Sequence, residues 1–436
     1  MADRKIVPGG ALRGEATLPG DKSISHRYAI LAALAEGASE IRHFAAADDC
    51  ARTLSCLEAL GVEVRREPDR ITIVGVGLDG LRTPGVDLDA GNSGTTLRML
   101  AGVLAGQRFD STLTGDSSVQ RRPMRRIVDP LTRMGARIEA RDGEYPPLRI
   151  HGVALRPIRY ETPVPSAQVK SCLLLAGLFA EGATTVVEPV PTRDHTELAL
   201  TEFGARLARG PGAAILAGRP RLAGRPLDVP GDVSSAVFLM AAALVLPGSE
   251  LTVRDVGLNP TRTAAIEFLA SMGAPVNVTV TGTIAGEARG DVAVRYGPLE
   301  GGVVSGAASA KMIDELPMLA ALGPYTRRGI TILDARELRV KESDRIAALA
   351  DNLRRMGARA EALADGLTVA GRRPEPLGGA EIDPRGDHRI AMAMAIAALG
   401  AARDSTIHDA DCAAVSFPGF FECLDRLLER RQTAST

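Results

Sequence analysis

Hydrophobic and polar residues follow one another along this chain in a pattern that returns six times. Each copy is an Ala- and Leu-rich stretch with helical periodicity that ends at a glycine and leads into a short β-branched stretch, which predicts a helix followed by a strand. Because glycine adopts the left-handed conformation without a Cβ clash, we expect these glycines to cap the helices. They are Gly37, Gly106, Gly182, Gly248, Gly329 and Gly400.

A second helix-ending pattern alternates with the first. It places a leucine four residues before a glycine, and strand-like alternation follows, as in 70–74 and 148–151. These glycines are Gly61, Gly135, Gly204, Gly273 and Gly357, and a sixth copy lies near 421–428. Together the patterns predict six α/β repeats of about 73 residues, each with the order strand–helix–strand–helix–strand–strand.

Composition narrows the classes of protein. The chain has 436 residues, 45% of them hydrophobic, so it can bury a large core, and its length predicts two or three domains. A formal charge of −1 gives no basic field that would recruit nucleic acid or an anionic membrane. The absence of tryptophan and an aromatic content of 3% argue against base-stacking platforms.

Several segments and residue types bear on location and cofactors. The N-terminus lacks the apolar core of a signal peptide, and apolar runs such as 236–246 are too short to cross a membrane. The five cysteines have no Cys-x-x-Cys spacing, and the six histidines have no metal-ligand spacing. We therefore expect reduced thiols, a cytoplasmic protein and no bound metal.

Polar residues gather where the predicted helices begin, about 12–16 residues before each closing glycine. The helix dipole disfavours cations at a helix start, so lysine and arginine there need another reason, which anion binding supplies. For the first helix family these segments are Lys22-Ser23, Asn92-Ser93-Gly94-Thr95, Ser166-Ala167-Gln168, Asp232-Val233-Ser234, 311–315 and Asp387-His388-Arg389. For the second family they are 120–123, Arg193-Asp194-His195 and 341–345.

The charges at these helix starts suggest a ligand with several negative groups. Ser23 and Arg27 are four residues apart and share one helical face. Lys22, Arg27, Arg122, Arg345 and Arg389 are candidates to converge on such a ligand. Asp314 and Glu342 are placed near them in the sequence for proton transfer. The alternative is that Asp314-Glu315 and Lys341-Glu342 form ordinary surface ion pairs. No nucleotide-binding glycine motif occurs.

Taken together and in order, eight segments are specific to one family. They are 21–27 (Asp-Lys-Ser-Ile-Ser-His-Arg), 91–96 (Gly-Asn-Ser-Gly-Thr-Thr), 120–123 (Gln-Arg-Arg-Pro), 166–168 (Ser-Ala-Gln), 193–196 (Arg-Asp-His-Thr), 313–315 (Ile-Asp-Glu), 339–345 (Arg-Val-Lys-Glu-Ser-Asp-Arg) and 386–389 (Gly-Asp-His-Arg). Over its full length the chain resembles the 5-enolpyruvylshikimate-3-phosphate (EPSP) synthase family.

The resemblance implies a reaction and an architecture. The family transfers the enolpyruvyl group of phosphoenolpyruvate to the 5-hydroxyl of shikimate 3-phosphate and releases phosphate, in aromatic amino-acid biosynthesis. Its fold has two lobes of three βαβαββ repeats each, which close over the substrates. The implied lobes here are 21–229, on the shikimate phosphate side, and 1–20 plus 230–436, completed by the N-terminal strand.

The resemblance also implies roles for residues at matching positions. Shikimate 3-phosphate would be bound by Lys22, Ser23, Arg27, Ser166, Ala167, Gln168, Arg193, Asp314 and Lys341. Phosphoenolpyruvate would be bound by Lys22, Asn92, Gly94, Arg122, Gln168, Arg345, His388 and Arg389. Asp314 would be the base for the 5-hydroxyl, and Glu342, with Lys22, the acid for the methylene carbon. The implied partners are these two small molecules, with no cofactor, nucleic acid or membrane, and a monomer is expected.

The chain departs from many relatives at three positions. Ala167 stands where many have a second serine, Val415 where some have a lysine that contacts phosphoenolpyruvate, and Arg193 where those same relatives have a tyrosine. All three are typical of the subfamily that includes glyphosate-tolerant enzymes. Gly94 is retained, however, where tolerant members often carry an alanine whose methyl crowds the inhibitor. The glyphosate response is left open by these residues, and titration of inhibition against phosphoenolpyruvate decides it.

Three alternatives compete with this interpretation. The related enolpyruvyl transferase that acts on UDP-N-acetylglucosamine typically uses a cysteine on a loop of the first lobe, and no cysteine lies between Cys56 and Cys172. A non-catalytic phosphosugar-binding repeat protein would not need Asp314 for turnover. An RNA-end-processing relative of the fold is disfavoured by the net charge and the few aromatic residues.

Overall fold

The chain divides into two compact units, each of which is described here by itself. The computed structural model describes residues 2–210, 212–372 and 376–429. Unit 1 comprises Met1–Pro19, Pro230–Gly282 and Ala288–Thr436, and unit 2 comprises Gly20–Val229 and Thr283–Glu287. Each unit has its own large cluster of buried apolar side chains, so each has its own core.

Unit 2 contains three four-stranded sheets of one design, in which a parallel pair of strands is extended by two antiparallel strands. The first, in the order β14-β3-β5-β4, joins Pro226–Asp228, Glu36–Arg42, Arg70–Val76 and Glu63–Arg66. The second, β6-β7-β9-β8, joins Leu88–Asp89, Asp110–Thr114, Tyr145–His151 and Arg137–Arg141. The third, β10-β11-β13-β12, joins Arg159–Glu161, Ala183–Val187, Ala213–Ala217 and Leu207–Gly210.

Unit 1 contains one sheet of that design and two variants of it. The regular sheet, β18-β19-β21-β20, joins Gly302–Val304, Gly329–Ile332, Leu367–Ala370 and Ala360–Ala362. A five-stranded sheet, β16-β17-β15-β2-β24, joins Val276–Ile284, Glu287–Arg295, Glu250–Gly257, Ala11–Thr17 and Leu428–Glu429. A three-stranded sheet, β1-β23-β22, joins Arg4–Ile6, Ser405–Ile407 and Glu381–Ile382.

Two strands are exchanged between distant parts of the chain. β2 directly precedes the first helix of unit 2, yet it pairs in parallel with β15 in unit 1. β14 directly precedes the first helix of the second half, yet it pairs in parallel with β3 in unit 2. The first repeat of unit 1 therefore contains β2, which precedes the helices of unit 2 in the sequence. The first repeat of unit 2 contains β14, which precedes the helices of unit 1.

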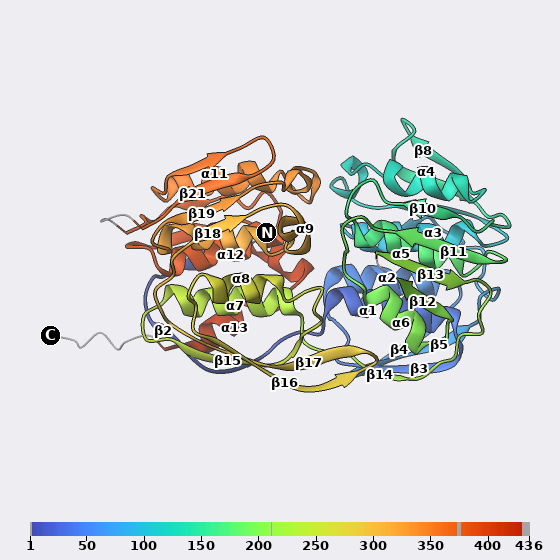
Figure 1. The fold of residues 1–436 in the computed structure, drawn as a ribbon, viewed down its shortest axis with the longest axis horizontal. Helices are drawn as coiled ribbons and strands as arrows, with labels where there is room; N and C mark the ends of the chain where they lie inside the picture. Colours follow the sequence, from blue (N-terminus) through green and yellow to red (C-terminus); the bar gives the residue numbers. More distant parts are fainter. Residues whose placement is uncertain (1, 211, 373–375, 430–436) are drawn as a thin grey trace. The chain divides into compact units, whose positions relative to one another are not determined.

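The first helix of each repeat is buried on nearly every side, as its Ala- and Leu-rich composition requires. In unit 2 these helices are α1 (Lys22–Leu34), α3 (Gly94–Ala105) and α5 (Ala167–Gly177). In unit 1 they are α7 (Val233–Val245), α10 (Leu316–Leu322) and α12 (His388–Leu399). In unit 1 the three pack against one another, and in unit 2 α3 packs against both α1 and α5. Figure 1 labels α7 and α12 in unit 1. Their starts carry most of the predicted site residues.

The second helix of each repeat is shorter or more polar. These helices are α2 (Asp48–Ala59), α4 (Arg125–Arg133), α6 (His195–Glu202), α8 (Ala264–Ser271), α11 (Arg345–Arg355) and α13 (Phe420–Leu427). Short 3₁₀ turns cover Val119–Arg121 (η1), Gly323–Tyr325 (η2), Arg336–Val340 (η3) and Ala410–Val415 (η4). None of the helices in the described ranges has the length and apolar character needed to cross a membrane.

The prediction that the six first-pattern glycines cap helices in the left-handed conformation was wrong. Four of them have positive φ but lie beyond the helix C-caps, namely Gly37, Gly182, Gly248 and Gly329. Gly106 and Gly400 do occupy the C-cap positions of α3 and α12, but with φ of −94°. Their reason is close packing, because a Cβ on Gly106 would lie 2.5 Å from Phe179, and one on Gly400 would lie 2.5 Å from Val245. All five second-pattern glycines adopt the left-handed conformation, with φ between 86° and 100°.

The helix predicted to start at 311–315 was also placed wrongly. A short helix, α9 (Ala307–Lys311), ends at Lys311, and α10 begins only at Leu316. Asp314 and Glu315 therefore lie in the turn between two helices. Pro317, in the first turn of α10, suits a helix start because its missing N–H is not needed there.

The hairpin of β16 and β17 extends from unit 1 and ends in unit 2. In Figure 1 the two strands run side by side as a long ribbon. The tip, Thr283–Glu287, groups with unit 2. There the buried Glu287 carboxylate lies 2.5 Å from Nδ1 of His195, at the start of α6.

Candidate active site

The start of α1 places Lys22 beside a carboxylate. Asp21 caps the helix, because its Oδ1 accepts a hydrogen bond from the backbone N–H of Ile24 at 2.9 Å. Lys22 follows, and its Nζ donates to Oδ2 of Asp49 on α2 at 2.8 Å. Both side chains are largely buried. The lysine predicted from the sequence is thus held at the helix start by an acidic residue that the sequence analysis did not single out.

Arg27 is buried and held by three oxygen acceptors. Its Nε donates to Oγ1 of Thr196 at 2.6 Å, its Nη2 to Oγ of Ser171 at 2.9 Å, and its Nη1 to the carbonyl of Ser23 at 2.7 Å. The last contact confirms that Ser23 and Arg27 share one face of the helix. Since the acceptors come from α1, α5 and α6, the guanidinium is oriented by three helices.

A second group surrounds the start of α3. Nη2 of Arg122 donates to Oδ1 of Asn92 at 2.7 Å and to Oγ of Ser118 at 3.0 Å. A Cβ placed on Gly94 would lie 2.7 Å from Nη1 of Arg98 and 3.1 Å from Nη1 of Arg122. The backbone at Gly94 thus lies against two guanidinium groups, and the close approach of a ligand there stays a prediction.

The start of α5 joins this group through a side-chain amide. Oε1 of Gln168 accepts from Nη1 of Arg98 at 2.7 Å, and its Nε2 donates to Oγ1 of Thr95 at 2.9 Å. Ser166 caps α5, and Ala167 is its first residue. Asn92, Gly94, Arg122, Ser166, Ala167 and Gln168 are therefore brought to the starts of two neighbouring helices of unit 2.

Arg193 lies directly before α6, in the loop that follows β11. Asp194 occupies the position before the helix, without a capping hydrogen bond from its side chain. Asp194 instead accepts from Nη1 of Arg209 at 3.1 Å. Arg193 is partly buried.

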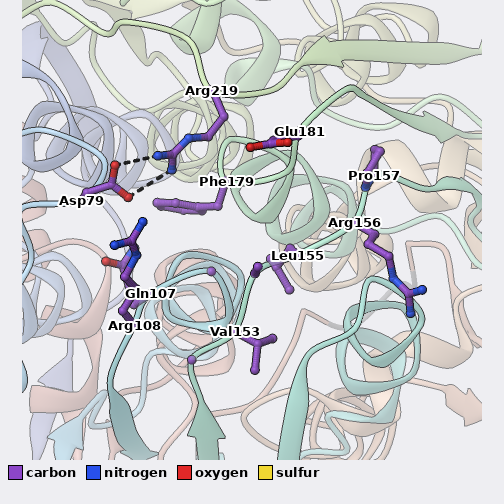
Figure 2. Close-up of a pocket in the computed structure, with 13 residues that line it drawn as sticks. Asp79, Gln107, Arg108, Val153, Leu155, Arg156, Pro157, Phe179, Glu181 and Arg219 are labelled. Atoms are coloured by element: carbon purple, nitrogen blue, oxygen red, sulfur yellow. Dashed lines mark hydrogen bonds and ion pairs between the residues drawn. The ribbon is translucent and has the colours of Figure 1, made fainter.

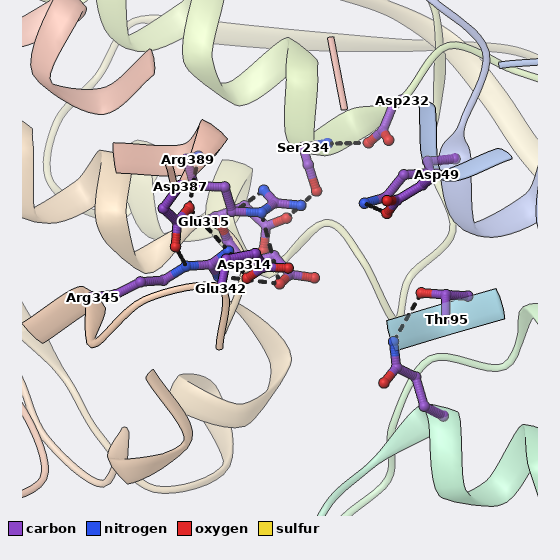
Figure 3. A network of polar contacts seen from close by, with 12 residues as sticks. Asp49, Thr95, Asp232, Ser234, Asp314, Glu315, Glu342, Arg345, Asp387 and Arg389 are labelled. Atoms are coloured by element: carbon purple, nitrogen blue, oxygen red, sulfur yellow. Dashed lines mark hydrogen bonds and ion pairs between the residues drawn. The ribbon is translucent and has the colours of Figure 1, made fainter. Parts of the chain in front are cut away.

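In unit 1 the buried guanidinium of Arg345 is shared by three carboxylates. Its Nε donates to Oδ2 of Asp387 at 2.8 Å, its Nη2 lies 2.5 Å from Oε2 of Glu342, and its Nη1 lies 3.8 Å from Oδ1 of Asp314. Figure 3 shows these side chains pointing toward one another. Burial acts to lower the pKa of Arg345, but the three carboxylates outweigh burial and raise it.

Arg389 and Lys341 complete this group. Arg389 donates from Nη1 to the carbonyl of Asp314 at 2.8 Å, and its Nε lies 3.8 Å from Oδ1 of the same residue. Burial, with help from Arg345, lowers the pKa of Lys341, while Asp314 and Glu342 act to raise it. Arg345, Arg389, Asp314 and Glu342 therefore form one group of charged side chains, and Lys341 lies within its electrostatic influence.

The alternative of ordinary surface ion pairs is wrong for these acids. Asp314 and Glu342 face the buried Arg345, and their side chains are only 19% and 17% exposed. Glu315 is buried and accepts a hydrogen bond from Ser234. His388, the first residue of α12, is also buried.

Three functional-site residues were missed as such by the sequence analysis. Asp49 pairs with Lys22, Arg98 with Gln168, and Asp387 with Arg345. Arg98 had a signal, because it lies four residues after Gly94 inside an otherwise apolar helix. Asp387 was noted only as a helix start, and it does cap α12 through the N–H of Arg389 at 3.0 Å.

The match to known proteins is decisive at this point. The family model described as EPSP synthase (3-phosphoshikimate 1-carboxyvinyltransferase) matches residues 6–424. The chain belongs to the EPSP synthase family. It is 54% identical to the 3-phosphoshikimate 1-carboxyvinyltransferase of Solibacter usitatus over 427 residues. This alignment covers 98% of this chain and 100% of the relative. The enzyme of that name from Koribacter versatilis is 50% identical over 430 residues, or 99% of this chain and 100% of the relative.

The fold of the chain is similar to those of solved enolpyruvyl transferases, including an EPSP synthase. The EPSP synthase of Acinetobacter baumannii has a TM-score of 0.86 and 40% identity, with 98% of both chains covered. The enolpyruvyl transferase NikO from Streptomyces tendae has a TM-score of 0.80 and 20% identity, with 99% of both chains covered, and supports the fold alone. The predicted family resemblance and α/β fold class are confirmed.

This member of the EPSP synthase family has a pocket of about 650 Å³ in unit 2, at the opposite ends of the same helices. It includes Gly106 at the end of α3 and Phe179 beyond the end of α5. On its rim Arg219 forms a two-point ion pair with Asp79, at 2.7 and 3.0 Å (Figure 2). The site residues predicted from the sequence are not among those that line it.

Proposed function

We propose that the chain transfers the enolpyruvyl group of phosphoenolpyruvate to the 5-hydroxyl of shikimate 3-phosphate and releases phosphate. The family match over residues 6–424 and the 54% identity to a relative named for this activity support the proposal. The observation that carries it is the group around Arg345, where one buried guanidinium contacts both carboxylates proposed for proton transfer.

Shikimate 3-phosphate is bound by hydroxyl, amide and cationic groups at the helix starts of unit 2, together with Lys341. Arg27 supplies charge from a fixed orientation, because three helices hold its guanidinium. The hydroxyls of Ser23 and Ser166 and the backbone N–H of Ala167 suit phosphate oxygens at a helix start. Gln168 and Arg193 contribute further donors.

Phosphoenolpyruvate is bound where a guanidinium group lies against an open backbone. The missing side chain of Gly94 lets Arg122, which Asn92 orients, lie close to the backbone at the start of α3. In unit 1, Arg345 and Arg389 provide two more cations, and the buried His388 lies between Asp387 and Arg389 in the sequence. Two anionic substrates repel each other, so several fixed cations are needed to bring them together.

Proton transfer is assigned to two carboxylates. Asp314 removes the proton of the 5-hydroxyl as its oxygen attacks C2 of phosphoenolpyruvate, and Glu342, with Lys22 as second donor, protonates the C3 methylene carbon. The product is a tetrahedral intermediate. Loss of a C3 proton and of the phosphate then restores the double bond and yields the enolpyruvyl ether.

The test is phosphate release when the protein is mixed with phosphoenolpyruvate and shikimate 3-phosphate, compared with either alone. We expect release with both substrates only. Asp314→Asn and Glu342→Gln should each lower kcat by at least about 100-fold. Glu361→Gln, on the exposed side of β20, is the control and should keep full activity. Undiminished turnover in Asp314→Asn refutes the assignment of the base.

We further propose that the protein is a cytoplasmic monomer whose functional lobes are 21–229 and 1–20 plus 230–436. The two compact units and their separate cores support the lobe bounds. The free, mostly buried cysteines are compatible with a reducing compartment. Sedimentation equilibrium tests the monomer, and a dimer mass at micromolar concentration contradicts it.

A further inference from the structure

A buried lysine lies between the two segments of unit 2 that carry proposed shikimate 3-phosphate residues. Lys170 is on α5, two residues after Gln168, and its side chain is 2% exposed. Its Nζ lies 2.7 Å from Oε2 of Glu188 and 2.7 Å from Oε1 of Glu197. Both carboxylates are also buried. The reaction proposed above does not use any of these three groups.

The same lysine reaches the loop that carries Arg193. Its Nζ is 3.5 Å from the carbonyl oxygen of Thr192, the residue before Arg193. The hydroxyl of Thr192 in turn donates to Oε1 of Glu188, at the other end of the loop. The segment 188–193 is thus closed on itself by Glu188 and tied to α5 by Lys170.

Neighbouring residues repeat this connection one step along both helices. Ser171, next to Lys170, lies 2.6 Å from Oγ1 of Thr196, next to Glu197. Those two hydroxyls are the ones that accept from Arg27. Adjacent pairs between α5 and α6 therefore hold Arg27 on one side and the Arg193 loop on the other.

Stability alone is a poor explanation for this cluster. One ammonium and two carboxylates have been removed from water, and buried charges of this kind often contribute no more stability than apolar side chains of the same volume. Burial raises the pKa of Glu197, and Glu188 adds to the effect, while Lys170 opposes it. What the three charges provide is a single fixed arrangement of α5, α6 and the loop.

We propose that Lys170, with Glu188 and Glu197, is a positioning residue for shikimate 3-phosphate binding. The cluster fixes Arg193 relative to Ser166–Gln168, so that both segments present their donors to the same substrate. This inference rests on the proposed function, because it takes Arg193 as a ligand of that substrate. A group displaced by about 1 Å in such a site costs up to about 100-fold in rate or binding.

The first test uses a substitution that keeps all three charges. Thr192→Val removes only the hydroxyl that donates to Glu188, and Thr192→Ser restores it. We expect Thr192→Val to raise KM for shikimate 3-phosphate by about three- to tenfold, less than the full worth of a hydrogen bond to a charged group, because Lys170 still ties the loop to α5. KM for phosphoenolpyruvate at saturating shikimate 3-phosphate should stay unchanged, and Thr192→Ser should recover the normal value.

The second test removes the cation. Lys170→Met keeps the length of the stem and should raise KM for shikimate 3-phosphate by about 10- to 100-fold. Glu197→Gln should be milder, because the amide oxygen still accepts from Lys170 and Glu188 still neutralises it. Leu216→Ala, a fully buried core change on β13 of the same repeat, is the control for lost stability. It should lower the melting temperature without changing either KM.

The outcomes distinguish a failure of the positioning role from a failure of the proposed binding of shikimate 3-phosphate by Arg193. If Arg193→Ala leaves KM for shikimate 3-phosphate unchanged, the ligand assignment itself is wrong. If Arg193→Ala raises that KM while Thr192→Val and Lys170→Met lower only the melting temperature, the positioning role is refuted. If Lys170→Met does not fold, Thr192→Val, Thr192→Ser and Glu197→Gln decide the question without it.

Discussion

A single added methyl group at Gly94 tests the proposed phosphoenolpyruvate site most directly. In the structure, the Cβ of an alanine at this position would lie 2.7 Å from Nη1 of Arg98 and 3.1 Å from Nη1 of Arg122. Ordinary contacts with a Cβ begin at 3.4 Å. Gly94 begins α3 with ordinary helical geometry, so alanine does not strain the backbone. The effect of Gly94→Ala is therefore confined to the two guanidinium groups.

The size of the effect follows from these distances. To reach 3.4 Å from the methyl, Nη1 of Arg98 must withdraw by about 0.7 Å, the difference between 3.4 and 2.7 Å, and that of Arg122 by about 0.3 Å. A shift of that size weakens the 2.7 Å hydrogen bond from Arg98 to Gln168. Losing about half of one charge-assisted hydrogen bond costs about 0.8–1.5 kcal/mol. We therefore expect KM for phosphoenolpyruvate to rise by about four- to twelvefold.

The assay is steady-state phosphate release with phosphoenolpyruvate varied at saturating shikimate 3-phosphate. Gly85→Ala is the control, because a Cβ there meets no atom within 4 Å and the φ angle is not positive. Titration of glyphosate against phosphoenolpyruvate in both variants also answers the question that the sequence left open. An unchanged KM for phosphoenolpyruvate in Gly94→Ala would show that the substrate does not approach these arginines, and the assignment of Gly94 and Arg122 would fall.

Three further predictions concern stability and reactivity. Asp387→Asn keeps the cap of α12 but removes a carboxylate that pairs with the buried Arg345, so urea denaturation should show a free energy of unfolding lower by about 1.5–3 kcal/mol. Asp387→Ala also removes the cap and should lower it by about 1 kcal/mol more. Equal losses in the two variants would show that the cap is not made. Hydrogen bonding to Asp3, chiefly, raises the pKa of His408. Its contribution to stability is therefore present below the ordinary histidine pKa and is lost as the pH rises through the raised one. The melting temperature of the parent minus that of His408→Gln should thus be larger near pH 6 than near pH 8, and a difference independent of pH contradicts the pairing. Burial raises the pKa of Cys56 and of Cys412 to about 12 and also raises that of Cys172. Iodoacetamide at about pH 8 should therefore label these three thiols far more slowly in the native protein than in the urea-unfolded protein. Equal labelling rates would show that the thiols are not protected.

Local periodicity was sufficient to find most helices and their starts. The spacing of apolar residues and glycines placed α1, α3, α5, α7 and α12 within a residue or two of their observed starts. It failed at 311–315, where Pro317 was the overlooked signal for a later start. The exchange of β2 and β14 has no local signal, because each strand pairs with a partner that is distant in the sequence. Such pairings depend on the path of the whole chain.

The candidate site was predictable in residue type but not in pairing. Glu342 lies three residues before Arg345, the first residue of α11, and a contact between residues so close in the sequence was within reach of sequence reasoning. The contact of Arg345 with Asp387 joins separate repeats, and its contact with Asp314 joins two segments of one repeat that are far apart in the sequence, so no spacing along the chain indicates them. The alternative of surface ion pairs failed for the same reason, since the burial of these acids is set by packing between segments that are distant in the sequence.

Buried cations show why position along a helix does not decide function. Arg27 and Lys170 both lie in the first two turns of inner helices, but only Arg27 was singled out from the sequence. They differ in their partners on α6, where Thr196 offers a neutral hydroxyl to Arg27 and Glu197 offers a carboxylate to Lys170. Glu188 adds a second carboxylate to Lys170, so that lysine is fully neutralised within the protein and is unsuited to bind an anionic substrate. Because Thr196 and Glu197 are adjacent, a shift of α6 by one residue would place Glu197 opposite Arg27 and Leu198 opposite Lys170. The anchoring of α6 therefore determines which cation serves the substrate and which serves the fold.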